Sequence, residues 1–300
     1  MKPKIHFLLN ERVPPEPGPA STRAMALLAD RSFAVSSGIP EESLLCPDRL
    51  GARHDLYVLV SQTELALSVA GVLHDRGGRF LNPYPGCAIA QNKITAASRL
   101  AAAGVPVPRC WLTADFARLC DLACEQPVVV KPYRSQRGAG VVVAHGPDDV
   151  AGIQLLEQPV LVQEFIAGDG SDLRIYVVGS SVFGMRKRRS DSGARAIGRP
   201  EVVTPQLRAI ALRCGQAFGL GLYGIDVIEG PGGPVVVDFD HAPGFRGVTD
   251  AAPLIARHVE DVLGGRTRLP AIPPAIQASA SWGGFLQDAP ACTPCTPLPT

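Results

Sequence analysis

Apolar runs alternate along the chain with polar segments that carry glycine and proline, and the spacing within each run distinguishes strands from helices. The first 84 residues contain both kinds of run: strands are predicted at 4–10, 54–61 and 79–82, and helices at 21–35 and 61–76. The spacing Ser61-Gln-Thr-Glu64 is typical of a capping box at a helix start. Because strands that alternate with helices build helix-covered sheets, we expect residues 1–84 to form a small open α/β unit.

From residue 85 onward, the pattern shifts toward strands joined in hairpins. Helices are predicted at 88–103, 147–156, 205–218 and 253–263, and strands at 126–131, 141–144, 159–166, 173–178, 182–188, 222–228 and 234–240. The segment 190–201 is polar and contains glycine, so it is predicted to be a loop. Residues 266–300 are rich in Pro, Ser and Thr with little periodicity, which predicts a weakly ordered tail.

The segment LYGIDVIEGPGGPVVVDFDHAPG, at 222–244, is the most informative stretch of the chain. Two runs rich in Val and Ile flank a Gly/Pro turn at Gly230–Pro234, which predicts a β-hairpin. Asp238 and Asp240 share a face of their strand, and Asp226 can lie opposite them. Three carboxylates on one face repel each other unless a cation lies between them, and oxygen ligands suit Mg²⁺. The alternative is that these acids face water on a half-exposed hairpin.

Composition narrows the class of partner. The chain has 29 basic and 28 acidic residues and a net charge of +1, so no basic field suggests a nucleic-acid or membrane partner. It has no apolar run long enough for a membrane span, and its N-terminal apolar run is too short for a signal peptide. Eight scattered cysteines without an export signal predict reduced thiols and a cytoplasmic location. Cys292 and Cys295 form a CxxC without a second ligand pair, so no metal is expected there.

A second candidate site lies at Lys131, which ends an apolar strand and precedes the loop PYRSQRGAG. A lysine beside such a loop can reach nucleotide phosphates while the amides near Gly138 and Gly140 cover them, and Arg134 and Arg137 add positive charge. GxxxxGK[ST] and GxGxxG are absent, so this is neither a P-loop nor a dinucleotide fingerprint. The alternative is a solvated surface lysine.

The strand LVQEFI, at 161–166, ends in polar residues and leads into Gly168-Asp-Gly-Ser-Asp172. The backbone and Glu164 at the strand end can read an adenine edge, and Asp172 can hold ribose hydroxyls. The alternative is a strand that ends in an ordinary polar turn.

A dense basic set follows on the next hairpin: Arg174, Arg186, Lys187, Arg188 and Arg189. Counting alternate residues, Arg174, Arg186 and Arg188 are predicted to share a register, with Lys187 and Arg189 facing the other way. Such a set can clamp a phosphate or a substrate carboxylate. A solvated basic edge strand is the alternative.

The order of these motifs resembles the ATP-grasp superfamily, and most closely its carboxylate–amine ligases of the ribosomal-protein-modifying, glutamate-adding type. The resemblance covers roughly residues 57–263 and rests on the lysine after a buried strand, the Gly loop, LVQEFI with its following acid, DLRIYVVG, the basic strand, GIDV and DFD…APG. It implies an α/β N-terminal domain plus two α+β subdomains forming an ATP-grasp fold. The corresponding domains are 1–84, 85–170 and 171–265, followed by the tail at 266–300.

The resemblance also implies roles for individual residues. The implied assignments are Lys93, Lys131, Arg137, Gly138 and Gly140 for the phosphates of ATP, Gln163, Glu164, Phe165 and Ile166 for adenine, Asp172 for ribose, Arg174 and Arg188 for the reacting phosphate, and Asp226, Asp238 and Asp240 for Mg²⁺ or Mn²⁺. His241, beside these acids, is expected to fill a loop position, with contact to substrate as the alternative.

Two departures from the family pattern concern turnover rather than nucleotide binding. The family has Glu and then Asn at its last two metal positions, in ExNxSPG, where this chain has Asp238 and Asp240 in DFDHAPG. Asp is one methylene shorter than Glu, and Asp in place of Asn adds a negative charge. The loop at 190–201 is shorter than the family's and lacks its Asn and paired Gly.

The sequence therefore predicts an ATP- and Mg²⁺-dependent carboxylate–amine ligase that works through an acyl phosphate. Its predicted substrates are small-molecule or peptide carboxylates and amines, with an amino acid among them. Two alternatives remain: an ATP-binding regulatory or scaffold protein that has lost ligation, and a small-molecule kinase of the same fold. The sequence leaves the oligomeric state open, with a homo-oligomer as one alternative.

Overall fold

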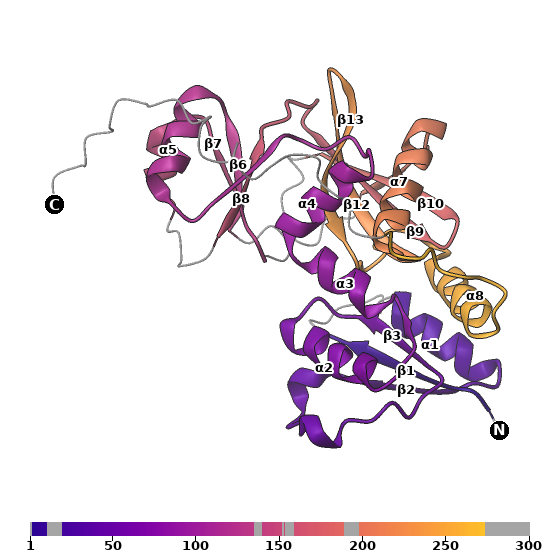
Figure 1. Cartoon of the computed structure of the whole chain (residues 1–300). Coiled ribbons are helices and arrows are strands. Elements are labelled where there is room, and N and C mark those ends of the chain that lie inside the picture. Colours follow the sequence, from indigo (N-terminus) through magenta and orange to yellow (C-terminus); the bar gives the residue numbers. More distant parts are fainter. Residues whose placement is uncertain are drawn as a thin grey trace.

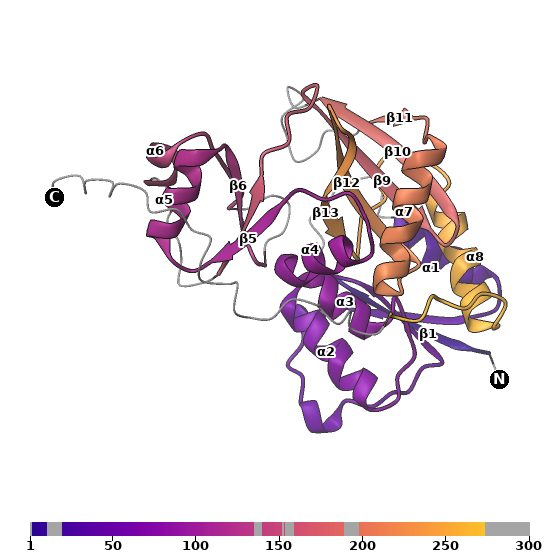
Figure 2. The same ribbon diagram turned by 45° about the horizontal axis from the view of Figure 1, so that its top comes forward.

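The computed structural model describes residues 2–10, 20–134, 140–151, 153, 159–188 and 198–273, which form three sheets (Figures 1 and 2). The N-terminal sheet has the order β2-β1-β3-β4 with all pairs parallel. Its elements are β1 (Lys4–Leu9), α1 (Ala20–Asp30), β2 (Ala34–Gly38), the 3₁₀ turns Pro40–Glu42 and Pro47–Arg49, β3 (Leu56–Val60), α2 (Glu64–Asp75) and β4 (Phe80–Leu81). The α/β pattern predicted here is confirmed, although the first helix ends earlier than predicted and the polar edge strand β2 follows it.

The central sheet is antiparallel, with the order β5-β8-β6-β7. Its region contains α3 (Tyr84–Gln91), α4 (Lys93–Ala102), β5 (Cys110–Thr113), α5 (Phe116–Glu125), β6 (Val128–Pro132), β7 (Val142–Ala144), α6 (Pro147–Ala151) and β8 (Val160–Glu164). The prediction of one helix over 88–103 is wrong, because Asn92 adopts an extended conformation and its side chain caps α4 by accepting a hydrogen bond from Ile94 N at 2.9 Å. This break places Lys93 at the first turn of α4.

The C-terminal sheet is antiparallel, with the order β11-β10-β9-β12-β13. Its region contains β9 (Ser171–Val178), β10 (Ser181–Arg188), β11 (Arg199–Glu201), α7 (Pro205–Phe218), β12 (Leu222–Gly230), β13 (Gly233–Asp240) and α8 (Ala251–Leu263). The predicted acid-bearing hairpin is confirmed as β12 and β13. Thr204 caps α7 and Pro205 begins it, as predicted.

The cores show which sheets are fixed to each other. One core combines residues of α2, α3 and α4 with β9, β12 and α7, and a second combines β1 and α1 with β9, β12 and α8. The central sheet has a small core of its own, formed with α5 and α6. The N-terminal and C-terminal sheets are therefore packed as one body, whereas the central sheet stands apart on the far side of α4 (Figure 1).

Asn82 reinforces the contact between the N-terminal and C-terminal sheets. It is fully buried, and its Oδ1 accepts hydrogen bonds from the backbone N–H groups of Gly221 and Leu222 at 3.0 and 2.9 Å. Its Nδ2 donates to the carbonyl oxygens of Leu222 and His241. Because all these groups are buried, this side chain satisfies backbone atoms at the start of β12 and after β13.

Among the described residues, no helix combines the length and apolar character needed to cross a membrane.

Candidate functional site

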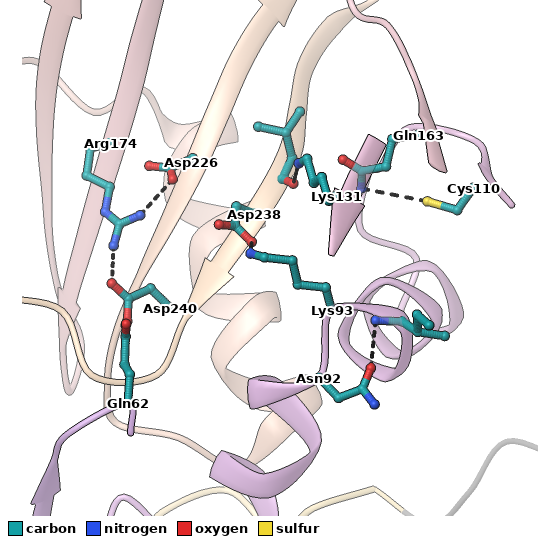
Figure 3. A network of polar contacts seen from close by, with 12 residues as sticks. Gln62, Asn92, Lys93, Cys110, Lys131, Gln163, Arg174, Asp226, Asp238 and Asp240 are labelled. Carbon is teal, nitrogen blue, oxygen red and sulfur yellow. Dashed lines mark hydrogen bonds and ion pairs between the residues drawn. The ribbon is translucent and has the colours of Figure 1, made fainter. Parts of the chain in front are cut away.

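The candidate site is built on a row of three charged residues that crosses three strands. Arg174 on β9 pairs in register with Asp226 on β12, and Asp226 pairs with Asp238 on β13. Residues that pair directly across antiparallel strands share a face, so these three side chains point to the same side of the sheet. Nη1 of Arg174 lies 2.8 Å from Oδ2 of Asp226, and Nη2 contacts Oδ2 of Asp240 (Figure 3). The arginine therefore bridges two of the three predicted metal-binding acids.

Gly224 makes room for this bridge. It pairs in register with Asp240, and a Cβ atom added at Gly224 would lie 2.9 Å from Nη2 of Arg174. The guanidinium therefore lies over the bare backbone of β12 to reach from the row to Asp240. A side chain at this position would compete with the arginine for space.

Two lysines approach the same hairpin from outside the C-terminal sheet. Nζ of Lys93 lies 2.6 Å from Oδ1 of Asp238, and Nζ of Lys131 donates to the carbonyl oxygen of Val237 at 2.8 Å (Figure 3). Lys131 is buried, and burial lowers the pKa of its ammonium although Asp238 opposes the shift. The predicted phosphate-binding lysines thus meet at adjacent residues of β13.

The pKa values of the facing acids Asp226 and Asp238 are shifted in opposite directions. Burial raises the pKa of Asp226 and outweighs the attraction of Arg174. Burial also disfavours the charge on Asp238, but Lys93 and Lys131 outweigh it and lower the pKa of this carboxyl. Of this facing pair, Asp238 therefore holds its negative charge more firmly, beside the two lysines.

The arrangement of the acids suits a metal ion held by two of them rather than by all three. Within the described part of the chain, no group of three or more His, Cys, Asp or Glu side chains is arranged to hold a metal. A facing pair is nevertheless present in Asp226 and Asp238, whose side chains are 36% and 35% exposed. Mg²⁺ is commonly bound by one or two carboxylates together with substrate phosphates and water. The residues present fit Mg²⁺ in that mode, and metal binding by all three acids stays a prediction.

Among the predicted adenine-binding residues, Gln163 lies beside the two lysines. A small cavity between the central sheet and β13 is lined on its polar side by Lys93, Lys131, Gln163 and Asp238, and its apolar walls come from α4, β8 and β13. Gln163 is buried and its Nε2 donates to Sγ of Cys110. Glu164 alternates to the other side of β8, where Nε of Arg109 lies 3.3 Å away. Phe165 follows, with its backbone N–H donating to Pro127, and Ile166 packs near Gly230.

The glycine loop is described only at its ends. Gly140 has φ of 72°, and a Cβ atom there would lie 2.8 Å from Cγ of Pro132, so both conformation and space require glycine. Arg134 pairs with Glu64 at the start of α2, at 2.8 Å, which fastens the beginning of the loop to the N-terminal sheet. The predicted roles of Arg137 and Gly138 fall outside the described residues.

The prediction that Arg174, Arg186 and Arg188 share a face is wrong. The turn after β9 contains two residues, Gly179 and Ser180, so Val178 pairs with Ser181 and every even-numbered residue of β9 faces an odd-numbered residue of β10. Arg174 therefore pairs with Met185, and Asp172 with Lys187, on the side of the site. Arg186 pairs with Leu173 on the other face, and the backbone of Arg188 pairs with that of Ser171. The side chain of Arg188 lies outside the description, and its predicted role at the phosphate stays a prediction.

Gln62 is a site residue that sequence reasoning missed. It follows β3 and its Nε2 donates to Oδ1 of Asp240 (Figure 3). Its carbonyl oxygen accepts a hydrogen bond from Nε2 of Gln91 at 2.7 Å. The available signal was its position, because ligand-binding residues of open parallel sheets lie beyond the carboxyl ends of the strands.

His241 is buried and burial lowers the pKa of its imidazole, which agrees with a space-filling loop position.

Comparisons with known proteins bear on the family and the fold of the chain. Residues 90–259 match the family model described as the RimK-like ATP-grasp domain. A probable alpha-L-glutamate ligase of Thioalkalivibrio sulfidiphilus is 30% identical over 178 residues, which are 54% of this chain and 59% of that relative. The chain thus spans less than two thirds of that relative's length.

Solved structures resemble the chain over most of its length. The RimK domain ATP-grasp protein of Sphaerobacter thermophilus has a TM-score of 0.70 at 22% identity, over 85% of this chain and 98% of that chain. The ATP-grasp ligase PsnB, solved with a variant of its minimal precursor, Mg and ADP, has a TM-score of 0.62 at 16% identity, over 87% of this chain and 99% of that chain. At these identities the likeness concerns the fold.

Proposed function

The chain belongs to the RimK-like ATP-grasp family and has the ATP-grasp fold, and on that premise we propose that it is an ATP- and Mg²⁺-dependent ligase that joins a carboxylate to an amine. The reaction would pass through an acyl phosphate, formed when a substrate carboxylate attacks the γ-phosphate of ATP and ADP leaves. The amine then displaces phosphate and leaves an amide or peptide bond.

The observation that carries the proposal is the meeting of Lys93 and Lys131 with the row of Arg174, Asp226 and Asp238. These cations come from α4, β6 and β9 and converge on one face of the hairpin. In the structure, the ammonium groups of the two lysines contact a carboxylate and a carbonyl oxygen. Polyphosphate oxygens are stronger partners for ammonium groups than a carbonyl oxygen is, so a bound nucleotide can take over these contacts.

The chain's own residues supply most of what phosphoryl transfer requires, since that chemistry depends on positioning and on charge stabilisation. Lys93 and Lys131 would hold the phosphates, and the guanidinium of Arg174 would stabilise charge on the transferred group. The buried position of Lys131 strengthens its attraction to an anion because little water screens it. Asp226 and Asp238 would hold Mg²⁺, which would supply positive charge against the phosphates.

The substrates we propose are an amino acid and a small-molecule or peptide carboxylate. The name of the Thioalkalivibrio relative makes L-glutamate the first amino acid to test. ADP release that requires both an amine and a carboxylate would support the ligase. ADP release without an amine would indicate a kinase, and nucleotide binding without turnover would indicate a regulatory or scaffold protein.

The first test is calorimetric titration of ATP with and without Mg²⁺, for the wild type and the Asp226→Asn/Asp238→Asn double variant. We expect the wild type to bind ATP more tightly with Mg²⁺ and the variant to lose this dependence, because its hairpin pair no longer carries charge. Absence of ATP affinity in the wild type, or equal affinity with and without Mg²⁺, would contradict the proposal. A Gly232→Ala variant is the control, since a methyl group there meets no atom within 4 Å.

A further inference from the structure

Asp240 has different surroundings from the other two acids of the hairpin, although the sequence groups all three. Its Oδ1 accepts hydrogen bonds from Nε2 of Gln62 and from the backbone N–H of Ala242, the latter at 2.9 Å. Its Oδ2 accepts a hydrogen bond from Nη2 of Arg174. These donors lie after β3, after β13 and on β9, so one carboxylate joins three separate parts of the chain. Figure 3 shows the contacts of Asp240 with Gln62 and Arg174.

Exposure separates the acids in the same way. The side chain of Asp240 is 17% exposed, about half the value of 36% for Asp226 and 35% for Asp238. In the described contacts, Asp226 uses Oδ2 for Arg174 and Asp238 uses Oδ1 for Lys93, so one oxygen of each is engaged. Both oxygens of Asp240 are engaged by donors of the protein. A cation at Asp240 would have to share Oδ2 with the positively charged guanidinium of Arg174, which repels it, or displace a donor from Oδ1.

Resting on the proposed function, we propose that Asp240 is a positioning residue and not a metal ligand. It holds the guanidinium of Arg174 over the site, and it ties Gln62, and with it the N-terminal sheet, to the reacting end of the hairpin. The metal is then left to Asp226 and Asp238 alone. The N-terminal sheet becomes a wall of the active site rather than an attached unit.

The position of Gln62 supports this role because the residue is held from both sides. Its backbone carbonyl accepts a hydrogen bond from Gln91, and the next residue, Thr63, caps α2 by accepting from Ala66 N at 3.2 Å. An ionised carboxylate accepts hydrogen bonds and donates none, so the NH₂ end of the Gln62 amide must face Asp240. The side chain is thus oriented by chemistry as well as by packing.

Gly224 offers a way to move Arg174 without altering any charged or polar side chain. An alanine at this position would place a methyl carbon 2.9 to 3.1 Å from the guanidinium atoms Nη2, Nε and Cζ. The atoms it meets are the end of a flexible side chain, so the arginine would shift while the sheet remains intact. Gly232, in the turn of the same hairpin, provides the matched control.

The test measures ATP affinity by calorimetry across a series of Mg²⁺ concentrations, for the wild type and for Asp240→Asn, Asp238→Asn, Gly224→Ala and Gly232→Ala. We expect Asp240→Asn to weaken ATP binding at saturating Mg²⁺ by about tenfold, because one charge-assisted contact to Arg174 is lost. The Mg²⁺ concentration that gives half of the increase in ATP affinity should stay within about twofold of the wild-type value. Gly224→Ala should behave like Asp240→Asn, whereas Gly232→Ala should match the wild type.

Asp238→Asn should instead raise by about tenfold or more the Mg²⁺ concentration that gives half of the increase in ATP affinity, because it removes a ligand charge. An equal rise for Asp240→Asn would overturn the positioning role while leaving the proposed function in place. Wild type that binds no ATP would overturn the proposed function. The positioning role is then decided by urea denaturation of Gln62→Leu, Asp240→Asn and the double variant. If the losses of unfolding free energy in the single variants do not add up to the loss in the double variant, the contact between Gln62 and Asp240 is supported. Additive losses would overturn it.

Discussion

Arg174 and Arg186 are matched in almost everything except their surroundings. Both lie on the C-terminal sheet, their side chains are 23% and 24% exposed, and each contacts two or more carboxylates. Arg186 lies 3.1 Å from Glu201 and 2.6 Å from Glu229, on the face opposite Arg174. The charge and the exposed fraction of the arginine side chain therefore do not distinguish the two.

The difference lies in what else reaches each cluster. The acids around Arg186 come from β11, β12 and the segment before β9, so this cluster stays within one sheet. Asp240, which contacts Arg174, also accepts a hydrogen bond from Gln62 after β3, and Asp238, which faces Asp226, pairs with Lys93 from α4. Where residues from several parts of the fold contact one cluster, its contacts change when those parts or a ligand move. A cluster whose residues all belong to one sheet contributes to stability instead.

The largest effect should come from replacing each arginine by lysine. Lysine keeps the charge but loses the planar fork, so it cannot bridge Asp226 and Asp240 simultaneously. We expect Arg174→Lys to lower the rate of ADP release by about 100-fold, the magnitude typical of losing one oriented charge-stabilising donor. Arg186→Lys should leave that rate within about twofold. Equal losses in both variants would show that the two clusters do not differ in function.

A smaller effect should come from Lys187, which register places on the face of Arg174, paired with Asp172. We expect Lys187→Met to weaken ATP binding by about tenfold, the value of one charge-assisted contact to a phosphate. Arg186→Met removes a charge from the neighbouring position on the opposite face and should leave ATP affinity unchanged. Calorimetry of the two variants measures the contrast, and weaker binding in Arg186→Met alone would reverse the assignment of faces.

Much of the fold follows from local pattern. The parallel N-terminal sheet, the acid-bearing hairpin and the capped start of α7 all have signals within a dozen residues. The strands β2, β5 and β11 and the helix α5 were missed, and β11 lies in the segment 190–201 that was predicted to be a loop. The edge strand β2 has the polar sequence AVSSG and β5 has four residues, so neither offers an apolar period long enough to detect.

The site was predictable where its residues face each other within one hairpin, as Asp226 and Asp238 do. The basic residues were misassigned because the predicted strands 173–178 and 182–188 leave three residues for the turn between them. The turn in the structure has two residues, and a difference of one residue exchanges the two faces of β10. Gln62 and Asp240 are 178 positions apart, and no pattern along the chain encodes their contact. Packing of the N-terminal sheet on the C-terminal sheet creates that part of the site.

The smallest effect concerns stability and salt. Removing the side chain of Arg186 in Arg186→Ala should lower the free energy of unfolding by about 1 kcal/mol, because its partners Glu201, Glu229 and Asp169 are 38%, 41% and 63% exposed and solvent screens such pairs. In 1 M salt the Debye length falls to about 3 Å, so most of this difference should disappear. Urea denaturation at low and high salt measures it. A loss that persists undiminished in high salt would mean that Arg186 acts through packing of its side chain, and the two arginine clusters would then differ in kind of contact as well as in function.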